Sequence, residues 1–496
     1  MEQYILALDQ GTTNSRAIIF DHSGRIKCSN QKEIKQIFPH PGWVEHNAEE
    51  IWESQVAVAK AAMSESGLTA RQISAIGITN QRETVVLWHK KSGKPLYNAI
   101  VWQCRRTTGI CMELKEKGYE DIFLYKTGLM VDPYFSGTKL KWLLDNISGA
   151  RKLAQNGELC FGTIDSWLIF NLTGRHVTDP TNASRTLLFN INNGEWDEEL
   201  LDILNIPCEL LPQVIPSCGD FGLSRRQIFG SEIQIGGVAG DQQAALFGQA
   251  CFEKGDIKNT YGTGCFTLIN TGREPVISKN RLLTTVAWDL GNGLEYALEG
   301  SVFIGGAVIQ WLRDQLMILE RAADSENIAR SIEDTGGVYM VPAFVGLGAP
   351  YWDPLTRGTI VGITRGTSRA HLIRAASESI AFQSRDLIKA IEADFGQHID
   401  ILKADGGASR NSFLMQFQAD ILGIPVVLPE ITESTALGAA YLAGLFCGFW
   451  QDQEEIKENW KIERRYAPEI KAEKRDKLLH GWQSAVTAAR KFKIAQ

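Results

Sequence analysis

The amino-acid sequence predicts an α/β protein in which two related domains flank a nucleotide-binding cleft. Three observations lead to this prediction: the length of the chain, the order of its strand and helix patterns, and the return of that order in the second half. With 496 residues, the chain is longer than one hydrophobic core usually supports. Strand patterns that alternate with helix patterns are typical of helices covering a sheet. We place the boundary near residue 250, which gives domains at 1–250 and 251–496.

The first half opens with a predicted antiparallel meander. Its strand patterns lie at 4–9, 15–20 and 25–34, and turn-forming residues separate them. A helix pattern then covers 48–66. Asn47 precedes it and Glu50 stands three residues later, which is the spacing of a capping box. Residues 73–79 predict a buried strand.

The second half repeats this order. Residues 256–272 predict a strand, a glycine turn and a second strand. Helix patterns follow over 303–323 and 369–395, and the second leads into residues 399–411. The tail from 451 to 475 is dense in charge and predicts a solvated linker before a last helix. Because no linker marks the boundary between the halves, we expect them to share a broad interface.

The composition excludes several classes of function. A net charge of −7 argues against a nucleic-acid-binding surface, which is usually basic. No apolar run is long enough to insert stably in a membrane, and the N-terminus lacks the features of an export signal, so we expect a cytoplasmic protein. The nine cysteines include no CxxC pair and the eight histidines do not cluster. A disulfide framework and a zinc site are therefore not expected.

Three glycine turns have the composition of phosphate-binding loops. They lie at 8–16, 260–266 and 404–411, in matching places of the two halves. Backbone N–H groups and hydroxyls in such turns can hold phosphate oxygens, although any one turn taken alone favours an ordinary hairpin. No GxxxxGK[ST] loop is present, and no GxGxxG motif opens a helix after a strand. Together the turns indicate a nucleotide clamped between the domains.

Polar residues stand at the ends of predicted strands. Asp9 ends the first strand, where it either starts a turn or holds Mg²⁺ beside phosphates. Arg82 and Glu83 follow a buried strand. Adjacent opposite charges are usually surface residues, but this pair also suits the hydroxyls of a polyol. Trp102 either packs in the core or covers the carbon chain of that polyol.

Asp241 is the one charged residue between positions 238 and 250. It follows an apolar stretch and precedes a helix pattern, so we expect it near a helix N-terminus, which favours the ionised carboxylate. That place suits a helix cap and also a general base. The neighbouring glycine turns and the Arg82–Glu83 pair favour the base.

Eight blocks of the sequence, in order, resemble the FGGY family of carbohydrate kinases, within the superfamily of sugar kinases, heat-shock proteins and actin. The blocks are LALDQGTTNSRAIIFD, TNQRET, VWQCRRT, DPYFSGTKLKWLLDN, GDQQAALFGQ, NTYGTGCF, VPAFVGLGAPYWDP and TESTALGAAYLAGL. They extend from about residue 4 to 450. Residues 134–146 match the first FGGY signature, and residues 358–378 match the second except at Ser377, where an apolar residue is usual.

The resemblance implies two ribonuclease-H-like domains, with ATP mostly on the second and the acceptor deep on the first. The blocks at 79–84 and 101–107 resemble the branch that phosphorylates glycerol to sn-glycerol 3-phosphate, the first step of glycerol catabolism. Xylulose, ribulose and gluconate remain alternative acceptors. An actin-like ATPase that binds protein would not need Arg82, Glu83 and Asp241, and no helix–turn–helix extension suggests a repressor. The resemblance also implies a homo-oligomer, a dimer or a tetramer.

Roles are carried over by motif. Glycerol would contact Arg82, Glu83, Tyr134, Asp241, Gln242, Trp102 and Phe266. ATP would contact Thr12, Thr13, Asn14, Arg16, Thr263, Gly306, Gln310, Gly407 and Asn411. Asp9 and Asp241 would hold Mg²⁺, and Asp241 would be the catalytic general base. Because phosphoryl transfer has a loose transition state, the hydroxyl proton leaves late and the base needs no strongly raised pKa.

Overall fold

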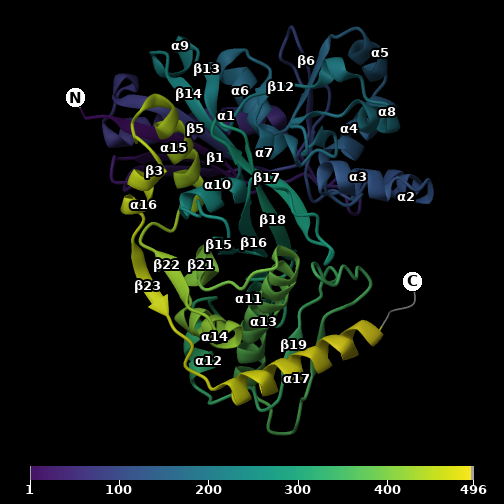
Figure 1. Ribbon diagram of the computed structural model, residues 1–496, viewed down its shortest axis with the longest axis vertical. Helices are drawn as coiled ribbons and strands as arrows, with labels where there is room; N and C mark the ends of the chain where they lie inside the picture. The colour runs from purple at the N-terminus through teal and green to yellow at the C-terminus, as the bar shows by residue number, and fades with distance from the viewer. Residues whose placement is uncertain (1, 493–496) are drawn as a thin grey trace.

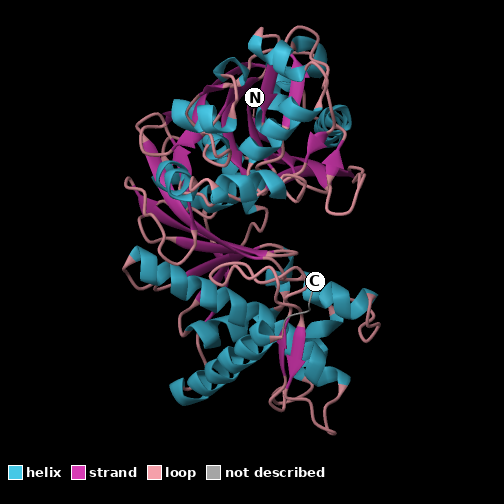
Figure 2. Ribbon diagram, turned by 90° about the vertical axis from the view of Figure 1, so that its right-hand side faces the viewer, coloured by secondary structure: helices cyan, strands magenta, loops and turns pink. Residues whose placement is uncertain are grey.

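Two sheets organise the chain in the computed structural model, which describes residues 2–492 (Figure 1). The first sheet has the order β13 (Cys218–Leu223), β14 (Gln234–Gly240), β5 (Ile73–Asn80), β1 (Tyr4–Gln10), β2 (Asn14–Phe20) and β3 (Ile26–Glu33). The second has the order β17 (Leu283–Asp289), β18 (Leu294–Val302), β16 (Cys265–Gly272), β15 (Ile257–Tyr261), β21 (Leu402–Asp405), β22 (Val426–Pro429) and β23 (Ile462–Tyr466). Most strands lie in the upper and middle parts of the molecule in Figure 2, with helices of the second half below them.

The two sheets share one pattern of strand directions. The strands β1, β2 and β3 are antiparallel neighbours, and so are β15, β16 and β18, although β17 lies between β16 and β18 in the chain. Strand β5 is parallel to β1, and β21 is parallel to β15 in the same position. A further parallel strand and an antiparallel edge strand follow in each sheet. The predicted α/β fold with two related halves is therefore confirmed.

Helices cover the faces of the sheets and fill the ends of the molecule. In the first half they are α1 (Ala48–Ser66), α2 (Thr108–Glu116), α3 (Glu120–Thr127), α4 (Ser136–Asn146), α5 (Ala150–Gln155), α6 (Ile164–Thr173), α7 (Pro180–Ala183), α8 (Glu198–Leu204), α9 (Arg226–Phe229) and α10 (Asp241–Gly248). In the second half they are α11 (Ala307–Asp314), α12 (Asp324–Arg330), α13 (Arg369–Phe395), α14 (Ser412–Leu422), α15 (Ser434–Cys447), α16 (Gln453–Asn459) and α17 (Ala472–Lys491). Within residues 2–492, no helix combines the length and the apolar character that crossing a membrane requires.

Short strand pairs complete the fold. They are β4 (Glu45–His46) with β7 (Ala99–Ile100), β6 (Val86–His89) with β8 (Leu159–Gly162), β9 (Val177–Thr178) with β12 (Gln213–Val214), β10 (Phe189–Asn190) with β11 (Glu195–Trp196), and β19 (Tyr339–Val341) with β20 (Thr359–Val361).

Helix α1 begins where the sequence predicts, after Asn47. The Asn47 side chain accepts hydrogen bonds from the backbone N–H groups of Glu49 and Glu50. The predicted capping box does not form, because the Glu50 carboxylate accepts from the backbone N–H of Lys35 instead (3.1 Å). A tertiary contact has replaced the reciprocal local bond.

Helix α15 of the second half packs on the first sheet, beside β5 and β1 (Figure 1). The approach is so close that a Cβ at Gly77 would lie 2.1 Å from the carbonyl oxygen of Ala439. A Cβ at Gly438 would lie 1.8 Å from the carbonyl oxygen of Ala244 in α10. Glycine is required at both positions because any side chain would overlap backbone. The interface between the halves is broad, as expected.

The predicted helix over 303–323 is wrong at both ends. Its first residues form a turn, because Gly305 and Gly306 donate their backbone N–H groups to the carbonyl oxygens of Thr263 and Gly262 (2.8 Å each). Helix α11 therefore starts at Ala307 and ends at Asp314. Beyond it the chain turns, with Met317 at a φ of 53°. Contacts with a distant turn have overridden the local helical pattern.

The predicted solvated linker over 451–475 is also wrong. This segment contains α16 and the edge strand β23, which pairs with β22. The side chains of Arg464 and Arg465 remain exposed while their backbone is paired. An edge strand can carry many charges, so charge density alone does not distinguish it from a linker. The predicted last helix is present as α17.

Candidate functional site

Three parallel strands of the first sheet end side by side. Asp9 of β1 lies opposite Thr79 of β5, and Asn80 lies opposite Gly240 of β14. Ligands of open α/β sheets bind outside the carboxyl ends of the strands. The residues that follow these ends are the turn at 11–14, the Arg82–Glu83 pair and Asp241, so the fold gathers at one edge the segments that the sequence singled out.

A buried cluster of charged side chains lies next to these strand ends. Arg82 forms an ion pair through Nε with Asp241 Oδ1 (3.1 Å) and donates from Nη1 and Nη2 to the Glu299 carboxylate (2.5 and 2.9 Å). Arg185 donates to Glu83 (2.6 Å) and to Glu299 (3.1 Å). Glu299 belongs to β18 of the second sheet, so the cluster joins the two halves. Burial opposes ionisation of Glu299, but Arg185 and Arg82 outweigh it and lower its pKa to about 2.

Asp241 is the first residue of α10, as the sequence predicts. Its Oδ1 accepts from the backbone N–H of Gln242 (2.7 Å), and a third of its side chain is exposed (33%). Among the described residues, no group donates a hydrogen bond to Oδ2. A helix N-terminus favours the carboxylate. Burial acts in the opposite sense and raises the pKa to about 6, with Glu83 and Glu299 contributing and Arg82 opposing.

Aromatic side chains form one wall of the site. Trp102 donates from Nε1 to the Thr12 hydroxyl (2.8 Å), and its ring meets Tyr134 edge-on at a centroid distance of 5.6 Å. The guanidinium of Arg185 lies 5.7 Å from the Tyr134 ring centroid. Burial first, and then Glu83, raise the pKa of Tyr134 above its ordinary value. Phe266, half-buried on β16, makes no ring contact with Trp102 in the described part of the chain.

Gln242 is turned toward a buried lysine. Its Oε1 accepts from Nζ of Lys258 in β15 (2.6 Å), and Lys258 also donates to the Thr260 hydroxyl (2.9 Å). Burial lowers the pKa of Lys258 to about 8, and Asp405, Glu299 and Asp241 oppose this shift. One lone pair of the Gln242 amide oxygen is thus used, and its N–H groups and second lone pair remain for a ligand.

The glycine turns of the second half pack against one another. Backbone bonds link residues 262–263 to 305–307, as described above, and Gly406 approaches β15. Gly406 has a φ of 87°, and a Cβ there would lie 2.5 Å from the carbonyl oxygen of Tyr261. Gly407 faces open space, and Asn411 caps α14 through its side-chain oxygen (3.0 Å to the Leu414 N–H).

The remaining predicted nucleotide contacts lie around these turns. Thr12, Thr13 and Asn14 form the turn after β1, closed by a 2.9 Å bond from the Gly11 N–H to the Asn14 carbonyl. Thr263 lies at the tip of the β15–β16 turn, and Gly306 precedes α11. Gln310 is exposed on α11. Apart from Gln310, these residues lie on turns of the two halves.

Asp9 is the candidate for a metal ligand. Its Oδ2 accepts from Arg16 (2.6 and 3.2 Å), and Arg16 also donates to Glu433 (2.5 Å). No described residue donates to Asp9 Oδ1. Residues 2–492 contain no group of three or more His, Cys, Asp or Glu side chains that could hold a metal. Mg²⁺ commonly takes one or two carboxylates and completes its shell with water and phosphate, so Asp9 and Asp241 fit it.

Sequence reasoning did not identify four buried charged residues near the site. They are Lys139, Arg185, Lys258 and Glu299, each 0% exposed. Glu299 and Lys258 are isolated charges in strand patterns, the same signal that singled out Asp241. Arg185 lies in an irregular segment and Lys139 in a helix that alternates charged and apolar residues, so neither carries a comparable local signal.

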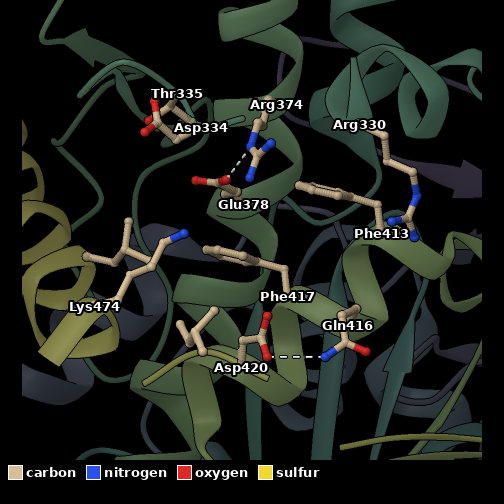
Figure 3. Close-up of a pocket in the computed structure, with 12 residues that line it drawn as sticks. Arg330, Asp334, Thr335, Arg374, Glu378, Phe413, Gln416, Phe417, Asp420 and Lys474 are labelled. Carbon is tan, nitrogen blue, oxygen red and sulfur yellow. Dashed lines mark hydrogen bonds and ion pairs between the residues drawn. The ribbon is translucent and has the colours of Figure 1, made fainter. Parts of the chain in front are cut away.

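A cavity of about 290 Å³ lies elsewhere, between α12, α13, α14 and α17. Figure 3 shows its Arg374–Glu378 ion pair (2.8 Å) and its Gln416–Asp420 hydrogen bond (3.1 Å). None of the site residues predicted from the sequence lines it. The candidate site is therefore defined by the strand ends and the charge cluster rather than by this cavity.

Comparisons with known proteins identify the family and agree with the fold. The model of the FGGY family of carbohydrate kinases, N-terminal domain, matches residues 4–248, and that of the C-terminal domain matches 257–447. The glycerol kinase of Caldanaerobacter subterraneus subsp. tengcongensis is 61% identical over 99% of both chains. The crystal structure of Plasmodium falciparum glycerol kinase with ADP has a TM-score of 0.93 and 36% identity, covering 98% of each chain. That of gluconate kinase from Lactobacillus acidophilus has a TM-score of 0.88 and 25% identity, covering 99% of each chain.

Proposed function

The chain belongs to the FGGY family of carbohydrate kinases, and we propose that it phosphorylates glycerol with ATP to give ADP and sn-glycerol 3-phosphate. Domain 1–250 binds glycerol and domain 251–496 binds most of the ATP. Similarity to glycerol kinases over the whole chain supports glycerol over gluconate, xylulose and ribulose. The observation that carries the proposal is the cluster of Arg82, Glu83 and Asp241 at the strand ends of the first sheet, which Glu299 joins to the second sheet.

The cluster has the chemistry of a polyol site. Arg82 donates hydrogen bonds, and the Glu83 and Asp241 carboxylates accept them from hydroxyls. The Arg82–Glu299 and Arg185–Glu83 pairs hold these side chains before a substrate arrives. Because the binding groups are preorganised, an acceptor that lacks a hydroxyl leaves a buried charge unpaired, which is costly. Trp102 and Tyr134 cover the carbon chain.

Asp241 accepts the proton of the reacting hydroxyl. Its Oδ2 is the oxygen without a partner, and the side chain is partly exposed. With a pKa of about 6 it is mostly a carboxylate at neutral pH. The Arg82 contact to Oδ1 fixes the carboxylate, so Oδ2 keeps its direction toward the acceptor. The glycine turns supply N–H groups for the phosphate oxygens.

Asp9 and Asp241 are the residues that would hold Mg²⁺, which supplies positive charge to the phosphate oxygens when bound. Arg16 already neutralises one oxygen of Asp9, and the other oxygen is open. The nine cysteines are free thiols, which supports the cytoplasm as the location.

A coupled assay of ADP release tests the proposal. Glycerol, dihydroxyacetone, D-xylulose and D-gluconate are compared at equal concentrations, with and without EDTA. We expect the largest kcat/KM with glycerol, and no turnover in EDTA until Mg²⁺ is restored. Equal efficiency on all four acceptors, or ADP release that needs no acceptor, would refute it.

A further inference from the structure

Lys139 of α4 is a buried ammonium group that no carboxylate pairs. Its side chain is 0% exposed, and within residues 2–492 it forms no ion pair. Its Nζ instead donates to three main-chain carbonyl oxygens, those of Tyr134, Phe135 (3.2 Å) and Glu83 (3.4 Å). An ammonium has three N–H donors, so all are used. Burying such a charge costs free energy, so a lysine at this position needs a compensating role.

The backbone at Glu83 is strained. Glu83 has a φ of 60°, and the Thr84 N–H donates across it to the Arg82 carbonyl oxygen (2.7 Å). A three-residue turn with positive φ at its centre is the rare and strained form. A residue without glycine's freedom holds this conformation only when its surroundings force it. Here the surroundings that contact the Glu83 carbonyl are Lys139 and the Ser136 hydroxyl (3.2 Å).

The segments that Lys139 joins both carry proposed glycerol ligands. One is the strained turn with Glu83, and the other is the entry to α4 with Tyr134. Lys139 touches neither Asp241 nor any of the glycine turns. Its hydrogen bonds therefore involve the segments proposed to bind the acceptor and not those proposed to bind the nucleotide.

We propose that Lys139 is a positioning residue, which clamps the strained turn at Glu83 to the start of α4 and so aims the Glu83 and Tyr134 side chains at the acceptor. The inference rests on the proposed function and deepens it. Ser136 is the second member of the clamp. When the ammonium is removed, the turn relaxes and the Glu83 carboxylate leaves its binding position.

Steady-state kinetics of Lys139→Met tests the clamp, because methionine keeps much of the volume and removes the charge. We expect KM for glycerol to rise about tenfold or more, while KM for ATP and kcat stay within about twofold. Ser136→Ala should raise KM for glycerol by a smaller factor. Lys141→Met is the matched control, since Lys141 lies on the same helix and pairs with Asp145 at the surface (3.1 Å). Its three constants should equal those of the wild type.

A double-mutant cycle separates the clamp from a general structural role. In a Glu83→Ala background one of the two ligands that Lys139 positions is gone, so Lys139→Met should change KM for glycerol less than in the wild type. Equal effects in both backgrounds, or equal rises of the two KM values, would overturn the inference. If Lys139→Met does not fold, Ser136→Ala replaces it in the double-mutant cycle with Glu83→Ala, and the same comparison of KM values tests the clamp.

The test of the clamp does not depend on which acceptor the wild type prefers. Wild-type turnover with glycerol tests the proposed function. If another polyol is the better acceptor, the same split between acceptor KM and ATP KM is measured with that polyol. An unchanged acceptor KM in Lys139→Met then refutes the clamp, whichever substrate the wild type prefers.

Discussion

The buried carboxylate of Glu299 should stabilise both the fold and the acceptor site. It accepts three charge-assisted bonds from Arg82 and Arg185, and all three side chains are buried. Its pKa falls from 4.5 to about 2, a shift that corresponds to about 3 kcal/mol of stability at neutral pH. Replacement by glutamine removes the charge and turns an amide N–H₂ toward arginine donors. We therefore expect Glu299→Gln to lower the free energy of unfolding by about 3 kcal/mol.

The pH dependence has a definite sign. Because the folded-state pKa of Glu299 is lowered, its contribution is fully present above 4.5 and is lost as the pH falls toward 2. The difference between wild type and variant should therefore be constant near pH 7 and shrink below 4.5. Urea unfolding followed by tryptophan fluorescence measures it. KM for glycerol should rise as well, since Arg82 loses the partner that orients it.

Glu295→Gln is the matched control, on the same strand. Burial raises the pKa of Glu295, with Arg273 opposing, so its charge is a cost to the fold rather than a gain. The control variant should be no less stable than the wild type at pH 7. If Glu299→Gln loses less than about 0.5 kcal/mol, the size of an ordinary surface substitution, and keeps its KM for glycerol, the reasoning about the cluster is wrong.

Three further predictions concern the reaction. Asp241→Asn should lower kcat by about 10² to 10⁴ without loss of stability, because Gly240 is the N-cap of α10 and the asparagine Oδ1 can still accept from the Gln242 N–H. A variant with normal kcat would show that Asp241 is not the base. The wild-type kcat/KM should fall about tenfold between pH 7 and pH 5, because at one unit below its pKa of about 6 roughly a tenth of Asp241 is ionised; a flat profile would contradict that pKa. Trp102→Phe keeps a ring but loses the bond to Thr12, so KM for glycerol should rise a few-fold in the steady-state assay, and an unchanged KM would show that this bond does not orient the ring.

Local patterns predicted much of the fold. The strands at 4–9 and 15–20, the helix after Asn47 and the helix over 369–395 are present with nearly the expected bounds. These elements follow from periodicity and capping, which depend on residues a few positions apart. Local patterns failed at 303–323 and 451–475, where contacts with the turn at 262–263 and pairing with β22 decide the outcome.

For the site, the sequence by itself determined which turns and strand ends carry polar residues, and it placed Asp241 at the start of a helix. Only the tertiary structure decided what those residues touch. Arg82 and Glu299 are 217 positions apart, and Lys139 reaches Glu83 across 56. The pKa of a buried charged group depends on its partner. Burial alone opposes ionisation, and an opposite charge nearby offsets that cost. The partner of such a charge is determined by the packing of the two sheets against each other, which a local sequence pattern does not predict.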